Sequence, residues 1–266
     1  GASTGIGAAT ALELVRHGFQ VFGTVRRVAD GEHLSAAGVT PVVMDVTDSG
    51  SIAAAHRAVV SGLAGQPLAG LVNNAGIQVA GPLEYLPLDD LRRVLEVNVV
   101  GVVAVTQAFL PELRRARGRI VNISSVSGRI ALPFGGPYSA SKFALEALSD
   151  SLRRELLPSG VRVVVIEPGS IATPIWQKVA QTDLARYRGT PYGQVLATAR
   201  DHVVKGGERG LPASAVAEAV ARALLAPRPP RRMLVVRHKL RTKLFQFLPD
   251  RLVDRAVSRR LWGPAR

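Results

Sequence analysis

Gly1-Ala2-Ser3-Thr4-Gly5-Ile6-Gly7 runs directly into a helical segment, Ala8–His17. Glycines at this spacing let the backbone approach a phosphate closely, and amides at a helix N-terminus supply donors and the positive end of the helix dipole. A tight turn without a ligand would also explain the three glycines. The stretch favours a parallel α/β sheet in which the loop follows a strand. That strand is absent from the given sequence, so the sheet is expected to lack its first strand.

Outward from this loop, short β-branched runs alternate with longer helical segments. Alternating strands and helices imply parallel crossovers and a sheet covered by helices on both faces. The expected strands cover Phe19–Val25, Thr40–Met44, Leu68–Val72, Arg119–Ile123, Val161–Ile166 and Arg232–Val236. The expected helices cover Ala8–His17, Ser49–Ser61, Leu88–Arg115, Tyr138–Leu157 and Ala213–Leu225. The pattern predicts one doubly wound α/β domain over residues 1–266.

Composition excludes several classes of protein. Of 266 residues, 47% are hydrophobic and 20% are charged, which is enough apolar material for a core and excludes a disordered chain. The absence of cysteine excludes disulfides and thiolate metal sites, and the histidines show no zinc-binding spacing, so no metal is expected. The longest apolar run, 97–105, is interrupted by Asn98 and Gly101, and no signal peptide opens the chain. The prediction is a soluble, cytoplasmic protein.

The net charge of +14 is concentrated at the C-terminal end of the chain. Residues 228–266 contain 12 basic and 2 acidic side chains, which leaves the rest of the chain only about +4. The tail also lacks interleaved aromatic residues and any nucleic-acid-reading motif, so no nucleic-acid partner is expected.

Arg26 and Arg27 follow the strand that ends at Val25. In many dinucleotide folds an acidic residue at this place binds the adenosine ribose hydroxyls, whereas guanidinium groups suit a 2′-phosphate. Surface arginines that merely flank a strand are the alternative, and the uncharged Thr4 adds no support. The two arginines favour NADP(H) over NAD(H).

A second set of residues predicts acid–base chemistry. Tyr138 and Lys142 are four residues apart on an expected helix and therefore share a face, where an ammonium lowers the pKa of a phenol. Ser125 follows the strand that ends at Ile123, at the edge of the sheet where ligands bind. Asn98 lies mid-helix, an unfavourable place for a short polar side chain unless it has partners. Each residue alone is more often structural, but in this order they indicate a site for alcohol–carbonyl interconversion.

Together these motifs resemble the short-chain dehydrogenase/reductase family over nearly the whole chain. The resemblance implies a Rossmann fold with strand order 3-2-1-4-5-6-7 and a catalytic tetrad of Asn98, Ser125, Tyr138 and Lys142. Tyr138 would exchange the hydroxyl proton during hydride transfer, Lys142 would also bind the nicotinamide ribose, Ser125 would orient the substrate oxygen and Asn98 would position a relay water. Implied cofactor contacts are Gly1, Ser3, Thr4, Gly5, Ile6, Gly7, Asp45, Val46, Asn73, Ala75, Gly76, Pro168, Gly169, Ile171 and Thr173, besides Arg26, Arg27, Tyr138 and Lys142. The family also implies a homodimer or homotetramer.

The expected substrate end is apolar. Residues 170–212 form an insertion, expected to be a mobile lid without its own strand, in which Trp176, Tyr187 and Tyr192 contact the substrate or pack the lid onto the body. Phe134 is expected on the opposite wall, beside Ser125 and Tyr138. A steroid, retinoid or fatty-chain alcohol or ketone suits these residues better than a sugar. The long C-terminal extension, in place of a glycine-rich end, resembles the steroid and retinol branch of the family.

Residues 238–266 are expected to form a basic amphipathic extension. Leu240, Leu244, Phe247 and Leu248 fall on one helical stripe, with Lys239 and other basic residues on other faces. Such a helix packs over the substrate cleft or lies on an anionic membrane surface. The leading hypothesis is thus an oxidoreductase; the alternatives are a non-catalytic dinucleotide sensor and a membrane-associated module.

Overall fold

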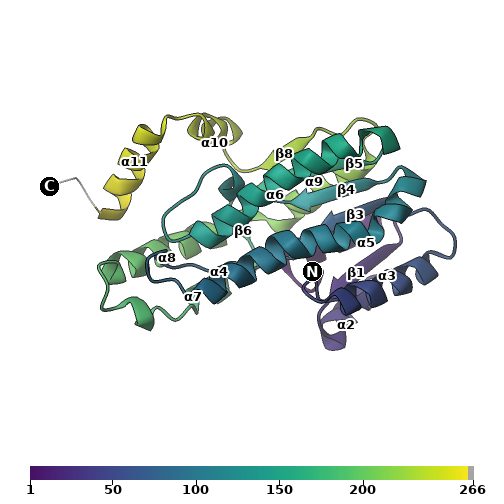
Figure 1. Cartoon of the computed structure of the whole chain (residues 1–266), viewed down its shortest axis with the longest axis horizontal. Helices are drawn as coiled ribbons and strands as arrows, with labels where there is room; N and C mark the ends of the chain where they lie inside the picture. Colours follow the sequence, from purple (N-terminus) through teal and green to yellow (C-terminus); the bar gives the residue numbers. More distant parts are fainter. Residues whose placement is uncertain (263–266) are drawn as a thin grey trace.

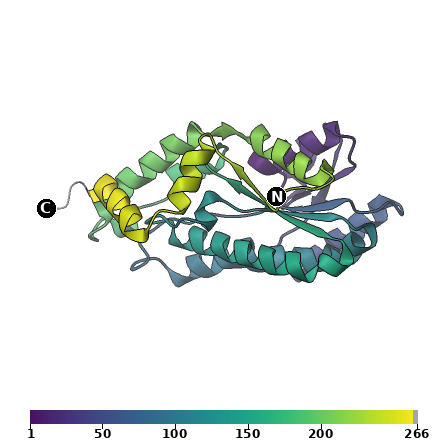
Figure 2. The ribbon, with the colours of Figure 1, turned by 90° about the horizontal axis from the view of Figure 1, so that it is seen from above.

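A computed structural model describes residues 1–262, which form a sheet between two helical layers (Figures 1 and 2). Helices α1 (Gly5–Arg16) and α9 (Ala213–Leu225) pack on one another on one face. Helices α3 (Ser49–Leu63), α5 (Gly101–Ala116) and α6 (Gly136–Glu155) cover the other face. Neighbouring residues of one strand serve the two layers, because Ile120 packs with α3 and α5 whereas Val121 packs with α1 and α9.

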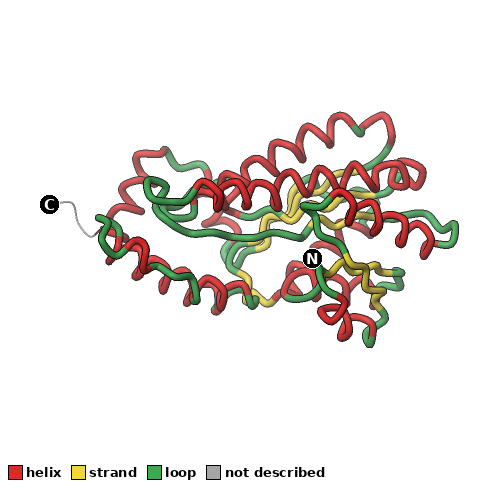
Figure 3. The backbone as a smooth tube through the Cα atoms, turned by 60° about the horizontal axis from the view of Figure 1, so that its bottom comes forward, coloured by secondary structure: helices red, strands yellow, loops and turns green. Residues whose placement is uncertain are grey.

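The strands of the central sheet are parallel and fall into two groups, visible in the tube of Figure 3. One group pairs β1 (Val21–Val25) with β2 (Val39–Val43). The other has the order β3 (Gly70–Asn73), β4 (Arg119–Ile123), β5 (Arg162–Pro168) and β8 (Arg232–Val235). All six strands expected from the sequence are present, with ends shifted by no more than two residues. The α/β architecture with a parallel central sheet is confirmed.

The two groups of strands are separated where the sequence predicts a missing first strand. A cavity of 410 Å³ lies between β1 and β3, and its lining includes Phe22, Leu71, Val105 and Phe109. At its edge, the Ala2 amide donates a hydrogen bond of 2.7 Å to the Thr24 carbonyl, in continuation of the β1 ladder. The observed groups fit the predicted strand order, with the first strand's place between β1 and β3.

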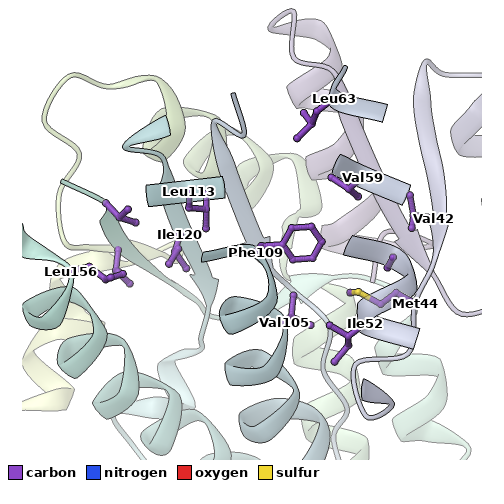
Figure 4. Packing of buried hydrophobic residues seen from close by; sticks show 13 residues of the cluster. Val42, Met44, Ile52, Val59, Leu63, Val105, Phe109, Leu113, Ile120 and Leu156 are labelled. Carbon is purple, nitrogen blue, oxygen red and sulfur yellow. The ribbon is translucent and has the colours of Figure 1, made fainter. Parts of the chain in front are cut away.

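The larger core cluster lies between the sheet and α3 and α5 (Figure 4). Phe109 of α5 is 4% exposed and lies between the side chains of α3 and those around Ile120. This cluster fixes α5 against the sheet, and α5 continues directly from the segment that bears Asn98.

The long helix 88–116 has an unexpected interruption. It consists of α4 (Leu88–Leu95), a π-helical turn at Glu96–Val100 and α5, and the π turn places Asn98 in the interior. Its length and composition would allow it to cross a membrane, which the short apolar run did not suggest. In this structure its inner face, including Val94, Val105 and Leu113, belongs to the protein interior.

The insertion 170–212 is more regular than a loop, which corrects the sequence expectation that it lacks a strand. Short strands β6 (Ile171–Ala172) and β7 (Leu211–Pro212) pair with each other in parallel. They flank α7 (Ile175–Ala180), a 3-10 turn at Ala185–Tyr187 and α8 (Gly193–Glu208). Strands β6 and β7 have two residues each and α7 has six, so these elements are too short to show an apolar period. The remaining elements are α2 (Glu32–Ser35), 3-10 turns at Val28–Gly31, Val126–Gly128 and Leu157–Ser159, and the C-terminal helices α10 (Lys239–Gln246) and α11 (Asp250–Trp262).

Candidate active site

The glycine loop packs tightly and leaves the start of α1 open. Gly5 has φ +59°, which favours glycine, and a Cβ on Gly7 would collide with the Gly1 carbonyl and lie 2.6 Å from Asn74 Nδ2. Asn74 Nδ2 donates to the Gly1 carbonyl at 2.8 Å and so ties the loop after β3 to the glycine loop. The Thr4 side chain makes no capping bond to α1, and the first turn holds no acidic residue. These features fit the binding of a pyrophosphate at this helix terminus.

The two arginines after β1 are not equivalent. Arg27 forms a bidentate pair with Asp30, with distances of 3.0 and 3.1 Å, and this pairing raises the pKa of the guanidinium. Arg26 is exposed and has no ion pair among residues 1–262. Its positive charge helps to lower the pKa of Asp45, which Thr47 lowers more strongly by hydrogen bonding. Arg26 is therefore the guanidinium that remains available near the predicted adenosine end.

Tyr138 and Ser125 meet at the carboxyl end of β4, as predicted. Their side chains are hydrogen-bonded, and Ser125 Oγ also accepts the Ser127 amide at 3.1 Å. Burial raises the pKa of Tyr138 above its ordinary value, and the Ser125 hydrogen bond opposes this only partly. The expectation that Lys142 lowers the pKa of the phenol is therefore not met, because desolvation is the largest influence.

Lys142 is 5% exposed and lies one helical turn beyond Tyr138. Its Nζ donates to the Ile123 carbonyl at 2.8 Å and lies 5.6 Å from the centre of the Tyr138 ring. Burial lowers the pKa of Lys142 to about 8, although the nearby Glu146 opposes this change. With a pKa of about 8, the Lys142 amine can gain or lose its proton close to neutral pH.

Asn98 organises the site from the π turn. Its Oδ1 accepts the Ile77 amide at 2.8 Å, and its Nδ2 donates to the Ile77 carbonyl at 2.9 Å and to Ser141 Oγ at 3.0 Å. Ser141 in turn donates to the Tyr138 carbonyl at 2.7 Å. Sequence reasoning missed Ser141, although its place three residues after Tyr138 on the same helix was a usable signal.

The cofactor-contact residues predicted after β3 divide into two roles. The Asn73 side chain is buried and donates to Thr106 Oγ1 and Asn122 Oδ1, so its amide joins neighbouring elements of the core. Ala75 lies against the glycine loop, because a Cβ on Gly1 would be 3.2 Å from its Cα. Gly76 faces Asn98 in the same way, because a Cβ on Gly76 would lie 3.3 Å from Asn98 Oδ1.

The segment after β5 reaches the glycine loop. A Cβ on Gly5 would lie 3.3 Å from the Cβ of Thr173, and the Gly169 amide donates to the Val235 carbonyl at 3.0 Å. Ile171 is buried in β6, and the Pro168 carbonyl lies 3.5 Å from Ser125 Oγ. Ser3 and Ile6 are partly buried in the glycine loop and α1, and Val46 packs against Gly101. The glycine loop, the Ser125 loop and the Pro168–Thr173 segment thus surround one edge of the sheet.

The aromatic residues of the insertion divide between packing within the insertion and contact with Phe134. Tyr187 is 3% exposed, and the Trp176 indole donates to the Ile171 carbonyl at 2.6 Å, which is the packing role that the sequence left open for them. Tyr192 bonds Glu84 at 3.1 Å and lies edge-on to Phe134, with ring centres 6.0 Å apart. Phe134 also meets Trp262 of α11 at 6.5 Å.

Known proteins resemble this chain in sequence and in fold. A profile of the short chain dehydrogenase family matches residues 1–184. The NADPH-dependent 3-dehydrocapnine reductase of Ornithobacterium rhinotracheale is 38% identical over 264 residues, covering 96% of this chain and 93% of the relative. Retinol dehydrogenase 5 of Mus musculus is 44% identical over 179 residues, covering 66% of this chain but only 56% of the relative.

Solved structures agree with these matches. A short-chain dehydrogenase from Streptomyces avermitilis superposes with a TM-score of 0.79 at 29% identity, covering 100% of this chain and 96% of the other. A short chain dehydrogenase from Burkholderia cenocepacia, in complex with NADP, has a TM-score of 0.73 at 26% identity and covers 99% of this chain and 95% of the other. The glycine loop, the Ser125–Tyr138 pair and Lys142 belong to the part that the profile matches. The chain therefore belongs to the short-chain dehydrogenase family of oxidoreductases.

Proposed function

We propose that this protein is an NADP(H)-dependent oxidoreductase that interconverts a secondary alcohol and a ketone of an apolar small molecule. The observation that carries the proposal is the Tyr138–Ser125 hydrogen bond, with the buried Lys142 one turn away, beside an open helix N-terminus. A non-catalytic dinucleotide sensor would not need a phenol placed between a hydroxyl and an ammonium.

Each residue has a defined task in this reaction. NADP(H), when bound, supplies or accepts the hydride. Ser125 Oγ hydrogen-bonds the substrate oxygen, and the Tyr138 hydroxyl gives that oxygen its proton during reduction and removes it during oxidation. Lys142 holds positive charge beside the forming phenolate, and Asn98 fixes the Ile77 backbone and, through Ser141, the start of α6. We also propose that Asn98 positions a water that relays protons to Lys142.

The exposed Arg26 supports NADP(H) over NAD(H), as does the name of the NADPH-dependent reductase relative. The open start of α1 supports the binding of either cofactor, because both carry the pyrophosphate. The apolar substrate is supported by the contact between Phe134, four residues before Tyr138, and Tyr192 of the insertion, and by the name of the retinol dehydrogenase relative. The test follows NADPH oxidation by the full-length protein with retinoid, steroid and long-chain ketones or aldehydes beside aldose sugars. Turnover of the sugars alone would contradict the substrate class.

Arg26→Ala should weaken NADPH binding by about tenfold and leave NADH binding unchanged, since a lost charge-assisted bond to a phosphate is worth about 1.5–3 kcal/mol. Arg27→Ala is the matched control and should have a smaller effect, because its guanidinium is engaged by Asp30. Titrations of both cofactors by nicotinamide fluorescence measure this difference. Equal weakening of NADH and NADPH binding by Arg26→Ala would contradict the assigned role.

We also propose that α10 places the enzyme on an anionic membrane surface. Leu240, Leu244 and Phe247 are 73%, 61% and 85% exposed, and α10 buries none of its residues. Their basic neighbours in the described part of the chain are exposed too: Lys239, Arg241, Lys243, Arg251, Arg255 and Arg259. An apolar stripe within a basic surface is the combination that binds anionic lipid. In contrast, α11 contacts α8 and brings Trp262 to Phe134, which is the packing alternative.

Sedimentation with phosphatidylcholine vesicles, with and without phosphatidylserine, tests the membrane contact. Binding is expected only with the anionic lipid and should be lost in Leu244→Glu/Phe247→Glu, whereas Val28→Glu, at another exposed apolar residue, should bind normally. Equal binding of both variants would contradict it.

A homodimer or homotetramer is proposed as well, supported by exposed apolar residues of the long helices such as Val100 and Phe143. Light scattering measures this mass, and a monomeric mass would contradict it.

A further inference from the structure

A cluster of charged side chains, in which two buried carboxylates meet two arginines that reach solvent, lies directly behind the candidate active site. Glu146 and Glu167 are each 5% exposed, and Arg129 and Arg232 lie against both of them. Arg232 Nε is 2.9 Å from Glu146 Oε2, and Arg129 Nη2 is 3.3 Å from the same oxygen. Arg129 Nε is 3.3 Å from Glu167 Oε1. Proton transfer in the proposed reaction uses none of these residues.

The cluster joins four segments whose other residues form the site. Glu146 is on α6, one turn after Lys142, and Arg129 follows the Ser125 loop by four residues. Glu167 immediately precedes Pro168 on β5, and Arg232 begins β8. A Cβ on Gly128 would lie 3.0 Å from the Lys142 carbonyl and 3.1 Å from Glu146 Cγ, so the Ser125 loop and α6 are in close contact here.

The charges around Glu146 are asymmetric. Its Oε2 is shared by Arg129 and Arg232, but its Oε1 is buried and has no hydrogen-bond partner among the described residues. Arg232 is also paired with Asp150 at 2.9 Å, and Asp150 with Arg153 at 3.3 Å. Glu167 faces the same two arginines, and both burial and Glu146 raise the pKa of its carboxyl. Arg154 also lies 3.7 Å from Asp150, so Asp150 has arginine partners besides Arg232. The Glu146 carboxylate shares both of its arginines with Glu167 and keeps the one unpartnered oxygen.

We propose that Glu146 is a positioning residue of the candidate active site: the cluster fixes its carboxylate one turn behind Lys142, where it keeps the lysine an ammonium. The amine at Lys142 is desolvated, with the Ile123 carbonyl as its hydrogen-bond partner, so a fixed negative charge on the next turn offsets part of the cost of burying the cation. The catalytic value of this charge rests on the proposed role of Lys142.

Carbon-13 NMR of lysine Cε atoms tests the proposal directly. The chain has only five lysines, Lys142, Lys178, Lys205, Lys239 and Lys243, and Lys142→Met assigns the signal of interest. In the wild type this signal should titrate with a pKa of about 8. In Glu146→Gln, which keeps the shape and removes the charge, the midpoint should fall by about one pH unit.

Glu155→Gln is the matched control. It removes the same charge from an exposed residue of the same helix, about 20 Å from Lys142 along the helix axis, and should leave the midpoint unchanged. If Glu146→Gln does not fold, Arg129→Gln serves, because removal of a cation beside Glu146 should raise the Lys142 midpoint. An Arg129→Gln midpoint at or below the wild-type value would count against the proposal.

A Glu146→Gln midpoint equal to that of the wild type would overturn the proposal. The measurement needs neither cofactor nor substrate, so a failure of the proposed hydride transfer would leave its result intact. In the same way, an unmoved midpoint would leave the proposed oxidoreductase activity untouched.

Discussion

Tyr138→Phe is expected to lower the rate of NADPH-dependent ketone reduction by about a thousandfold, since general acid catalysis contributes about 10²–10⁴. The change removes only the hydroxyl oxygen that hydrogen-bonds Ser125. The ring remains beside Lys142, whose Nζ lies 5.6 Å from its centre. The loss should therefore fall on kcat, measured as initial rates with the best substrate from the ketone and aldehyde comparison.

Cofactor affinity is the control for this variant. NADPH binding by Tyr138→Phe should stay within about twofold of the wild type, because the glycine loop and Arg26 are unaltered. A variant that binds NADPH normally and still reduces the ketone at more than about a tenth of the wild-type rate would exclude Tyr138 as the proton donor.

Gly7→Ala is expected to weaken NADPH binding by about a hundredfold, which corresponds to about 3 kcal/mol. A Cβ at this position would collide with the Gly1 carbonyl oxygen and lie 2.6 Å from Asn74 Nδ2, so the loop and the segment after β3 must separate. This separation would break the Asn74–Gly1 hydrogen bond and move the amides at the start of α1. Fluorescence titration with both NADPH and NADH should show equal losses, since the pyrophosphate is common to the two.

Gly206→Ala provides the comparison. Gly206 lies within α8, and a Cβ there would meet nothing within 4 Å. This variant should bind NADPH normally and unfold at a slightly higher temperature, because alanine is favoured over glycine in a helix by about 0.5–1 kcal/mol. NADPH affinity in Gly7→Ala equal to that in Gly206→Ala would show that the glycine loop does not bind the pyrophosphate.

The placement of the candidate site residues was largely predictable, with an informative exception. Tyr138 and Lys142 share a helix face by spacing alone, and Ser125 follows a strand whose ends β4 reproduces without a shift. The pKa of Tyr138 was not predictable from this spacing. The sequence pairs the phenol with an ammonium, but the fold buries both, and desolvation raises the one pKa while it lowers the other.

In the insertion 170–212, by contrast, the sequence did not predict which aromatic residues are buried. The three aromatic residues of the insertion looked equivalent in sequence, yet Tyr187 is buried, the Trp176 indole is bonded to the Ile171 carbonyl, and only Tyr192 meets Phe134. Exposure within a short irregular segment depends on which distant residues cover it, and no periodic pattern encodes that choice.

The parallel α/β fold, the glycine loop and the order of the Asn98, Ser125, Tyr138 and Lys142 motifs could be read from the amino-acid sequence. These follow from short-range rules of side-chain periodicity, turn chemistry and helical spacing. Three contacts became visible only in the folded chain: Asn98 reaches Ser141, Asn73 bonds within the core, and Glu146 is enclosed with Glu167 by Arg129 and Arg232. Hydrogen bonds between distant segments, burial and the resulting pKa values depend on how the elements pack, and packing brings together residues whose separation in sequence carries no signal.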